Sequence, residues 1–274
     1  MAQKQGFERF WDMSFGGNDT SNDIPRGFAV FLAGLVQALC KILFRISVKN
    51  QEIISAFKGK ERGAVIVAPH VSYLDVAIMF LSVRPTKQWV RLIGRDTLFK
   101  GILGWILSRV GAFPIKRDTA DRTAIKRATK MLKNGELIGV FPEGTRRGKG
   151  SKTPDIHGGA ALIARMGKAP LVPLGLKNLE LVKQKGKRVR FPRITAVFGE
   201  PISVDAFNFL PKDERFDACM WYVLRESFAL SHDISAEEVD MVTLFPESKD
   251  YTDVFCGHTI ERVNMNELKE YSKG

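Results

Sequence analysis

Apolar positions between residues 64 and 198 alternate between short runs and longer segments with helical spacing. The short runs are rich in Val, Ile and Leu, and they cover residues 64–68, 87–92, 112–115, 137–141 and 171–176. Runs of this length and composition predict buried parallel strands. Segments with helical periodicity lie between them, at residues 73–81, 98–109, 121–133 and 159–165. The alternation predicts an α/β fold with a largely parallel central sheet flanked by helices.

The pattern changes after the fifth short run. Residues 183–188 read Lys-Gln-Lys-Gly-Lys-Arg and predict a basic hairpin turn around Gly186, followed by an edge strand near residues 194–198. Residues 205–274 then read as a mainly helical appendix, in which 216–230 is the clearest helix.

The first 48 residues differ from the rest of the chain. Residues 1–25 are polar and lack the basic stretch leading into an apolar stretch that marks a signal peptide, so they predict a loose arm. We therefore divide the chain into an N-terminal arm with an apolar helix (1–48), an α/β domain (49–204) and an acidic helical appendix (205–274).

A strongly apolar segment covers residues 27–46. Gln37, Lys41 and Arg45 interrupt it before it reaches the ~20 clean residues that a bilayer span requires. Their spacing of four places them in one polar stripe on an otherwise apolar helix. Such a helix is expected either to lie on a membrane surface or to pack, buried, on the α/β domain.

Composition and charge narrow the class of protein. The 274 residues are 45% apolar and 26% charged, which excludes a disordered chain, and the mean hydropathy of −0.09 excludes a polytopic membrane protein. Three widely spaced cysteines, Cys40, Cys219 and Cys256, give no disulfide framework or zinc knuckle and indicate a reducing cytosol.

The charge is unevenly distributed. The chain has a net charge of +12, but residues 205–274 hold 7 Lys and Arg against 15 Asp and Glu, so residues 1–204 carry +20. A basic surface formed by residues 1–204 could bind nucleic acid, an anionic membrane or a phosphorylated substrate. Alternatively, it is ordinary solvated surface. The basic pairs have few interleaved aromatic residues and match no RNA-binding motif, which argues against nucleic acid.

A histidine and an aspartate follow the first predicted strand. His70 lies two residues before Ser72, and Ser72 and Asp75 have the spacing of a capping box at a helix start. The Asp75 carboxylate can then reach back to His70, orient its imidazole and stabilise the imidazolium that forms when His70 accepts a proton. This pair would be the base and orienter of a triad without its serine, so the nucleophile would be a hydroxyl of the substrate. Alternatively, Asp75 only caps the helix and His70 only fills a loop.

Charged residues also follow three later strands. The strand at 137–141 leads into Pro-Glu143-Gly-Thr-Arg146, where Arg146 could grip a phosphate and Glu143 could accept hydroxyl hydrogen bonds or hold Arg146. Arg117 follows the strand at 112–115, and Val172-Pro173 lies in the fifth strand. Because parallel strands end on one rim, these groups could converge with His70 there. A solvated turn is the other interpretation of this Arg-rich loop.

Taken in order, these segments resemble the four motifs of the glycerolipid acyltransferases, specifically the bacterial 1-acylglycerol-3-phosphate acyltransferases. The motifs are His70-x4-Asp75, Gly111-x-Phe-x-Ile-x-Arg117, Phe141-Pro-Glu-Gly-Thr-Arg146 and Val172-Pro173, and the resemblance covers about residues 30–204. Two positions depart from the family pattern. Pro69 stands where an Asn is usual, and residues 156–160 read Ile-His-Gly-Gly-Ala where a Phe-Lys-x-Gly-Ala-like stretch is usual.

The resemblance implies an activity and roles for particular residues. His70 would be the general base and Asp75 its orienter. Glu143, Gly144, Thr145 and Arg146 would bind the phosphate and glycerol, with help from Arg117. The implied reaction moves an acyl group from acyl-CoA or acyl carrier protein to lysophosphatidic acid at the cytoplasmic face of the cell membrane, where the protein would be peripheral or monotopic on an anionic surface.

Other interpretations remain open at this stage. The same chemistry could serve another lysophospholipid or an amino-acid lipid, or the chain could be a non-catalytic basic module that anchors on lipid phosphates. His157, His232 and His258 have no second ligand at metal spacing, so neither a metal nor another cofactor is implied.

Overall fold

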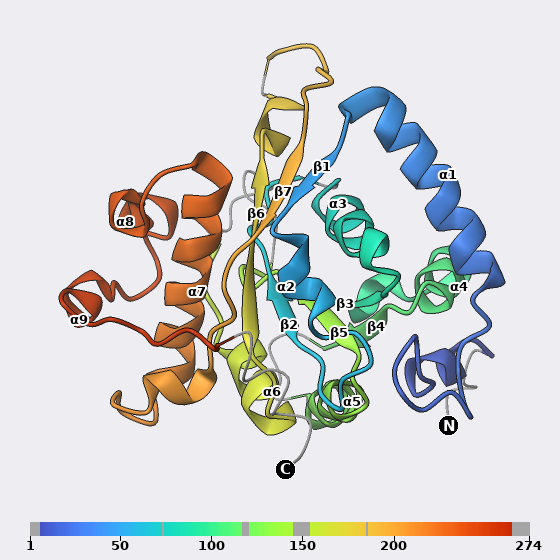
Figure 1. Ribbon diagram of the computed structural model, residues 1–274, viewed down its shortest axis with the longest axis horizontal. Helices are drawn as coiled ribbons and strands as arrows, with labels where there is room; N and C mark the ends of the chain where they lie inside the picture. Colours follow the sequence, from blue (N-terminus) through green and yellow to red (C-terminus); the bar gives the residue numbers. More distant parts are fainter. Residues whose placement is uncertain (1–5, 73, 117–120, 145–153, 185, 265–274) are drawn as a thin grey trace.

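The computed structural model describes residues 6–72, 74–116, 121–144, 154–184 and 186–264. The strands of this part are β1 (Ser47–Lys49), β2 (Val65–Val67), β3 (Val90–Arg95), β4 (Phe113–Ile115), β5 (Leu137–Val140), β6 (Leu171–Lys177) and β7 (Thr195–Phe198). They form one sheet in the order β1-β7-β6-β2-β5-β3-β4 (Figure 1). Every neighbouring pair is parallel except β6 and β7.

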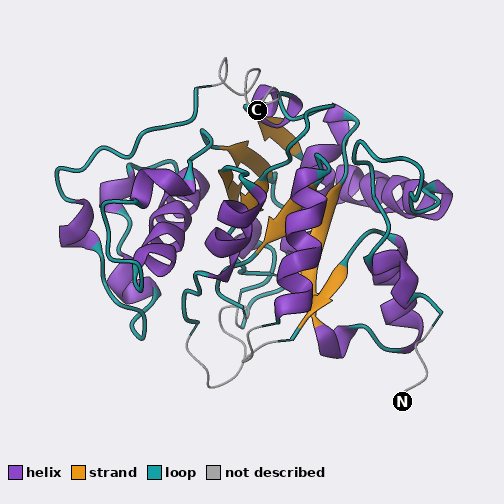
Figure 2. Cartoon of the chain, turned by 90° about the horizontal axis from the view of Figure 1, so that it is seen from below, coloured by secondary structure: helices purple, strands orange, loops and turns teal. Residues whose placement is uncertain are grey.

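Helices cover both faces of this sheet. They are α1 (Gly27–Phe44), α2 (Gln51–Ser55), α3 (Leu74–Val83), α4 (Gly101–Arg109), α5 (Arg122–Lys133), α6 (Gly159–Gly167), α7 (Arg215–His232), α8 (Met241–Leu244) and α9 (Thr252–Phe255). One hydrophobic core joins the sheet to α1, α2 and α3, and another joins it to α5, α6 and α7. Figure 2 shows the strands enclosed between these helices. The predicted α/β class, with its apolar N-terminal helix and its helical C-terminal part, is confirmed.

The central strand β2 shows why its sequence is a continuous apolar run. Val65 and Val67 contribute to the core on the α5–α7 side, whereas Ile66 contributes to the core on the α1–α3 side. All three side chains are fully buried. A parallel strand covered on both faces has no solvent side, so it needs no polar positions.

The C-terminal part is built into this core. Helix α7 packs directly on the sheet: Ser227 Oγ donates to the Val67 carbonyl at 3.1 Å, and the Leu176 N–H donates to Ser231 Oγ at 3.0 Å. A Cβ at Gly175 would lie 2.5 Å from Leu230 Cβ, so only glycine allows this close contact between strand and helix. The first helix of the predicted appendix therefore closes one face of the α/β domain.

Strand β7 differs from its prediction in one respect. It pairs antiparallel with β6, as a hairpin partner should, but it is not an edge strand, because β1 pairs with its other side from Ser47 to Lys49. Strand β1 has only three residues and directly follows the apolar helix, so it leaves no separate signal in the sequence.

The N-terminal arm is ordered from residue 7 to residue 24, contrary to the predicted loose arm. Its residues Phe10, Phe15 and Ile24 are buried. The fully buried Arg91 of β3 forms a 3.3 Å ion pair with Glu136 and donates to the carbonyls of Met13 and Phe10 in the arm. Glu136 in turn accepts the Phe15 N–H at 3.1 Å. A buried ion pair thus attaches the arm to the sheet.

Helix α1 follows the arm and lies along the outside of the molecule (Figure 1). It is long and apolar enough to cross a membrane, contrary to the expectation that Gln37, Lys41 and Arg45 interrupt it too early for a span. Helices that do not span a membrane can have the same length and composition. One face packs inward through Ala29, Ala33, Cys40 and Phe44. The other face exposes large apolar side chains to solvent, namely Val30, Phe31, Leu35, Leu39 and Ile42. The inward face agrees with the predicted packing on the α/β domain, and attachment of the outward face to a membrane stays a prediction.

Candidate active site

The candidate residues leave the sheet at one edge because β2 and β5 are parallel neighbours. Val67 at the end of β2 is paired with Val140 at the end of β5. The chain after β2 reaches His70, and the chain after β5 begins with Phe141. The rings of these two residues stack with centroids 4.5 Å apart and an interplanar angle of 27°. The structure thus brings the first and third sequence motifs into contact.

His70 and Asp75 form the predicted pair. His70 Nδ1 lies 2.8 Å from Asp75 Oδ2, and the Asp75 side chain is fully buried while that of His70 is 17% exposed. A carboxylate can only accept, so it selects the tautomer with hydrogen on Nδ1. The other nitrogen, Nε2, is then the one that can accept a proton.

The start of α3 holds Asp75 in place. The Ser72 N–H donates to both carboxylate oxygens, at 2.8 Å to Oδ2 and 3.1 Å to Oδ1, and the Leu74 N–H donates to Ser72 Oγ at 3.2 Å. The bonds from Ser72 to Asp75 are the carboxylate half of the predicted capping box, whereas the Ser72 hydroxyl accepts from Leu74 and not from Asp75. Asp75 therefore caps the helix and orients His70 with the same carboxylate.

Glu143 makes a contact that the sequence did not predict. It is 1% exposed, and its Oε1 accepts the backbone N–H of His70 at 3.3 Å. The carboxylate thus ties the loop after β5 to the loop that carries the histidine. Gly144 follows with φ of +60°, a left-handed conformation that favours glycine. Arg117, Thr145 and Arg146 lie outside the described residues.

Arg95 is a further cation at this edge that sequence reasoning missed. It ends β3, the strand beside β5, and its exposed side chain lines the same pocket as His70 and Gly144. The predicted strand stopped at Leu92, three residues before the true end, so the argument that identified cations after strands did not reach it. The sequence could have identified it, because the apolar run continues through Ile93 and Arg95 follows after Gly94.

His70 and Arg95 border a pocket of about 370 Å³. The remaining lining is almost entirely apolar and comes from α1, α3, β3 and α4, including Leu32, Val36, Phe80 and Leu107. None of the described residues that line it is a serine, threonine or cysteine. A hydrocarbon chain would fit this lining.

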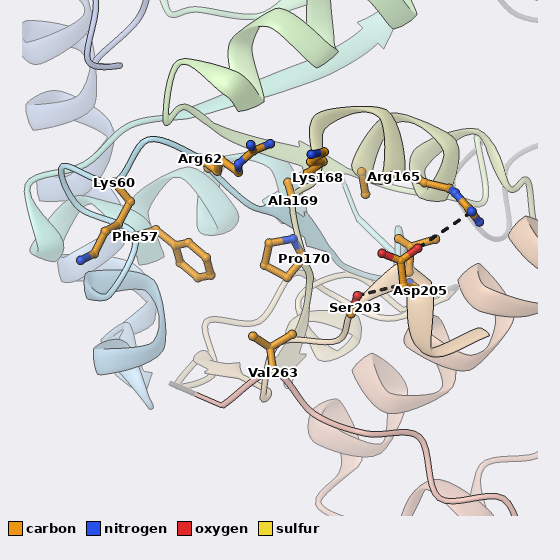
Figure 3. A pocket seen from close by; sticks show the side chains of 13 residues that line it. Phe57, Lys60, Arg62, Arg165, Lys168, Ala169, Pro170, Ser203, Asp205 and Val263 are labelled. Atoms are coloured by element: carbon orange, nitrogen blue, oxygen red, sulfur yellow. Dashed lines mark hydrogen bonds and ion pairs between the residues drawn. The ribbon is translucent and has the colours of Figure 1, made fainter. Parts of the chain in front are cut away.

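A second pocket, of about 300 Å³, lies at the opposite edge of the sheet (Figure 3). Its lining includes Gly63, two residues before β2, and Pro170, directly before β6. The lining also includes the cations Lys60, Arg62, Arg165 and Lys168. It contains none of the candidate residues. The strands separate it from His70, so the chemistry belongs to the first pocket.

Comparisons with known proteins identify the family and the fold. The sequence profile of the Acyltransferase family matches residues 45–177. The 1-acyl-sn-glycerol-3-phosphate acyltransferase of Bacillus subtilis is 31% identical over 189 residues, covering 69% of this chain and 89% of the relative. The enzyme of that name from Streptococcus pneumoniae is 30% identical, covering 69% and 68%. A crystal structure of the 1-acyl-sn-glycerophosphate (LPA) acyltransferase from Thermotoga maritima shares the fold, with a TM-score of 0.53 at 22% identity over 72% of this chain and 77% of that one.

Proposed function

Because the chain belongs to the acyltransferase family, we propose that it moves a fatty acyl group from a thioester to the sn-2 hydroxyl of lysophosphatidic acid, giving phosphatidic acid. The observation that carries this proposal is the 2.8 Å His70–Asp75 pair at the border of an apolar pocket whose described lining includes no serine, threonine or cysteine. The donor is acyl-CoA or acyl carrier protein.

The chemistry follows from the free nitrogen of His70. Nε2 takes the proton of the acceptor hydroxyl, and the oxygen attacks the thioester carbonyl. Asp75, bound at Nδ1, stabilises the resulting imidazolium. When the tetrahedral intermediate collapses, the C–O bond remains, the C–S bond breaks, and the imidazolium returns its proton to the departing sulfur. No acyl-enzyme is formed.

The cations at the sheet edge that carries His70 bind the acceptor phosphate. Arg95 is placed for this at the end of β3, beside the loop that carries Gly144. We assign the same task to Arg117 and Arg146, since each follows a strand that ends at this edge. Arginine suits a phosphate because its planar fork donates two parallel hydrogen bonds.

The substrates are lipids, so the site must open toward a membrane. The pocket is lined in part by α1 and α4, and both helices expose apolar side chains on their outer faces, with Phe31 68% and Ile102 80% exposed. The rings of Phe28 and Trp105 join the two helices at 4.9 Å. We place the enzyme at the cytoplasmic face of the membrane, with α1 and α4 in the interface and its three cysteines free, as in a reducing compartment.

Thiol release from acyl-CoA and from acyl carrier protein, measured with a panel of lysolipid acceptors, tests the activity. We expect release with lysophosphatidic acid, loss of release in His70→Ala, and full release in His258→Ala, whose histidine is exposed and stacks on Phe209 away from the site. Release with a different lysophospholipid or an amino-acid lipid alone would reassign the acceptor. If no acceptor produces thiol release, the remaining interpretation is a non-catalytic module that binds lipids.

A further inference from the structure

The loop that joins β6 to β7, residues 178–194, is a concentrated basic surface and is called the basic loop below. Its described part carries one acidic residue, Glu180, and five exposed cations, namely Lys183, Lys187, Arg188, Arg190 and Arg193. Within the described residues, none of the five is in an ion pair with a carboxylate. Their positive charge is therefore available to an external anionic surface.

Apolar side chains alternate with these cations. Val189 and Phe191 are each 50% exposed, and they flank Arg190. Exposed apolar groups among cations are unfavourable in water but fit the boundary between phosphate headgroups and acyl chains. This alternation favours a lipid surface over an acidic protein. An acidic protein would provide partners for the cations, but it would not provide a hydrocarbon layer for the two apolar side chains.

Hydrogen bonds hold the loop in shape. Asn178 Nδ2 donates to the Arg193 carbonyl at 2.9 Å across its base, and the Arg190 N–H donates to the Val182 carbonyl at 2.9 Å nearer the tip. Figure 1 shows the loop projecting beyond the strands that it joins. The cations are thus presented on a defined structure.

The basic loop continues the exposed face of α1. The Phe191 ring lies 5.5 Å from that of Phe44 at the end of α1, and the Ile194 N–H donates to the Phe44 carbonyl at 3.1 Å. The loop also follows the carboxyl end of β6, which is parallel to β2, so it lies at the same edge of the sheet as His70. A bilayer that covers α1 would therefore reach the loop as well.

We propose that the basic loop binds the anionic headgroups of a lipid bilayer and makes the enzyme select anionic membranes. The proposal rests on the interfacial position of α1 proposed above. In it, α1 supplies apolar attachment to any bilayer and the loop supplies the preference for negative charge. A near-surface cation strengthens binding to such a membrane about fivefold, the equivalent of about 1 kcal/mol.

The test compares two variants with equal loss of charge. The loop variant carries Lys187→Ser, Arg188→Ser and Arg190→Ser. The control variant replaces three exposed lysines of α5 and the end of α6, on the other face of the sheet from α1, and carries Lys130→Ser, Lys133→Ser and Lys168→Ser. Sedimentation with vesicles measures binding, using phosphatidylcholine alone and an equal mixture with phosphatidylglycerol, at physiological salt. Thermal unfolding verifies that both variants are folded.

We expect the loop variant to bind the anionic vesicles up to about 10²-fold more weakly and the phosphatidylcholine vesicles unchanged. The control variant should stay within about twofold on both, because charges more than about 8 Å from the surface are screened at this salt. Equal losses in the two variants would overturn the proposal in favour of overall charge. An unchanged loop variant would also overturn it.

Further outcomes distinguish lipid binding by the basic loop from binding of the acyl carrier protein and from attachment by α1. If the loop variant keeps its vesicle binding but its KM rises for acyl carrier protein and not for acyl-CoA, the loop binds the acidic carrier and the proposal is wrong. The vesicle assay contains no acyl donor, so its result does not depend on acyl transfer. Failure of α1 to attach would appear instead as weak binding of the unmodified protein to phosphatidylcholine vesicles.

Discussion

Replacing Asp75 by Asn isolates the orienting role of this carboxylate from its structural role. The two side chains have nearly the same shape, and an Asn oxygen can still accept the Ser72 N–H, which donates to the carboxylate at 2.8 and 3.1 Å. Asp75 Oδ2 accepts the shorter Ser72 bond and also faces His70 Nδ1 at 2.8 Å. An Asn that places its oxygen there keeps both contacts but has no negative charge to stabilise the imidazolium. An Asn that places its NH2 there keeps only the longer Ser72 bond and directs a donor at Nδ1. An NH2 group only donates, so Nδ1 becomes the acceptor and the ring hydrogen moves to Nε2.

The expected cost follows from the lost negative charge in the first orientation and from the change of tautomer in the second. With hydrogen on Nε2, His70 has no free nitrogen facing the acceptor hydroxyl and cannot act as its base. Comparable substitutions of orienting carboxylates cost roughly 10²–10⁴ in rate, which corresponds to about 3–5 kcal/mol in the activation free energy. The helix cap survives, so we expect the free energy of unfolding to fall by only about 1 kcal/mol.

The assay measures kcat from thiol release at saturating donor and lysophosphatidic acid, together with urea unfolding of the same preparation. Asp240→Asn is the matched control. Asp240 also caps a helix, since it precedes α8 and accepts the Thr243 N–H at 2.9 Å, and it lies away from the site. A variant Asp75→Asn within threefold of the unmodified kcat, with the Asp240→Asn control unchanged, would refute the orienting role. A comparable loss in the control would point to a general effect on folding.

Three other substitutions test separate parts of the molecule. Arg146→Lys should raise the KM for lysophosphatidic acid more than the KM for the donor, since lysine keeps the charge but not the bidentate fork; an equal rise in both would assign Arg146 to the donor instead. Arg91→Met leaves Glu136 buried without its cation, so urea denaturation should show a loss of about 3–5 kcal/mol in unfolding free energy, and a neutral result would contradict the attachment of the arm. Serine replacements on the exposed face of α1 should release the protein from liposomes at moderate salt, whereas high salt should only weaken binding of the unmodified chain; retention would exclude α1 as the anchor. The three replaced residues are Phe31, Leu35 and Leu39.

Local patterns predicted most of the elements. The apolar runs mark β2 to β6 because a parallel strand buried on both faces has no polar positions, and the helical segments between them carry one apolar side each. The His70–Asp75 contact was predictable for the same reason. Both residues lie within one strand-to-helix turn, and the capping geometry of that turn determines where the carboxylate reaches.

Contacts between distant segments were decided by the tertiary structure. Glu143 meets the His70 backbone, and Arg91 meets Glu136 and the N-terminal arm, only because strands far apart in sequence become neighbours in the sheet. Nothing in the local spacing of these residues identifies their partners. The polar composition of residues 1–25 likewise predicted a loose arm, although its few aromatic side chains occupy buried positions once the sheet has formed.

The sequence by itself determined the order of strands and helices along the chain, the approximate positions of their ends and the chemistry available after each strand. Only the tertiary structure decided the order of strands in the sheet, the inclusion of α7 in the core and the apolar pocket beside His70. The physical reason is that periodicity reports which side of an element avoids water. It does not report which other surface covers that side, because any apolar surface of suitable shape lowers the free energy in the same way.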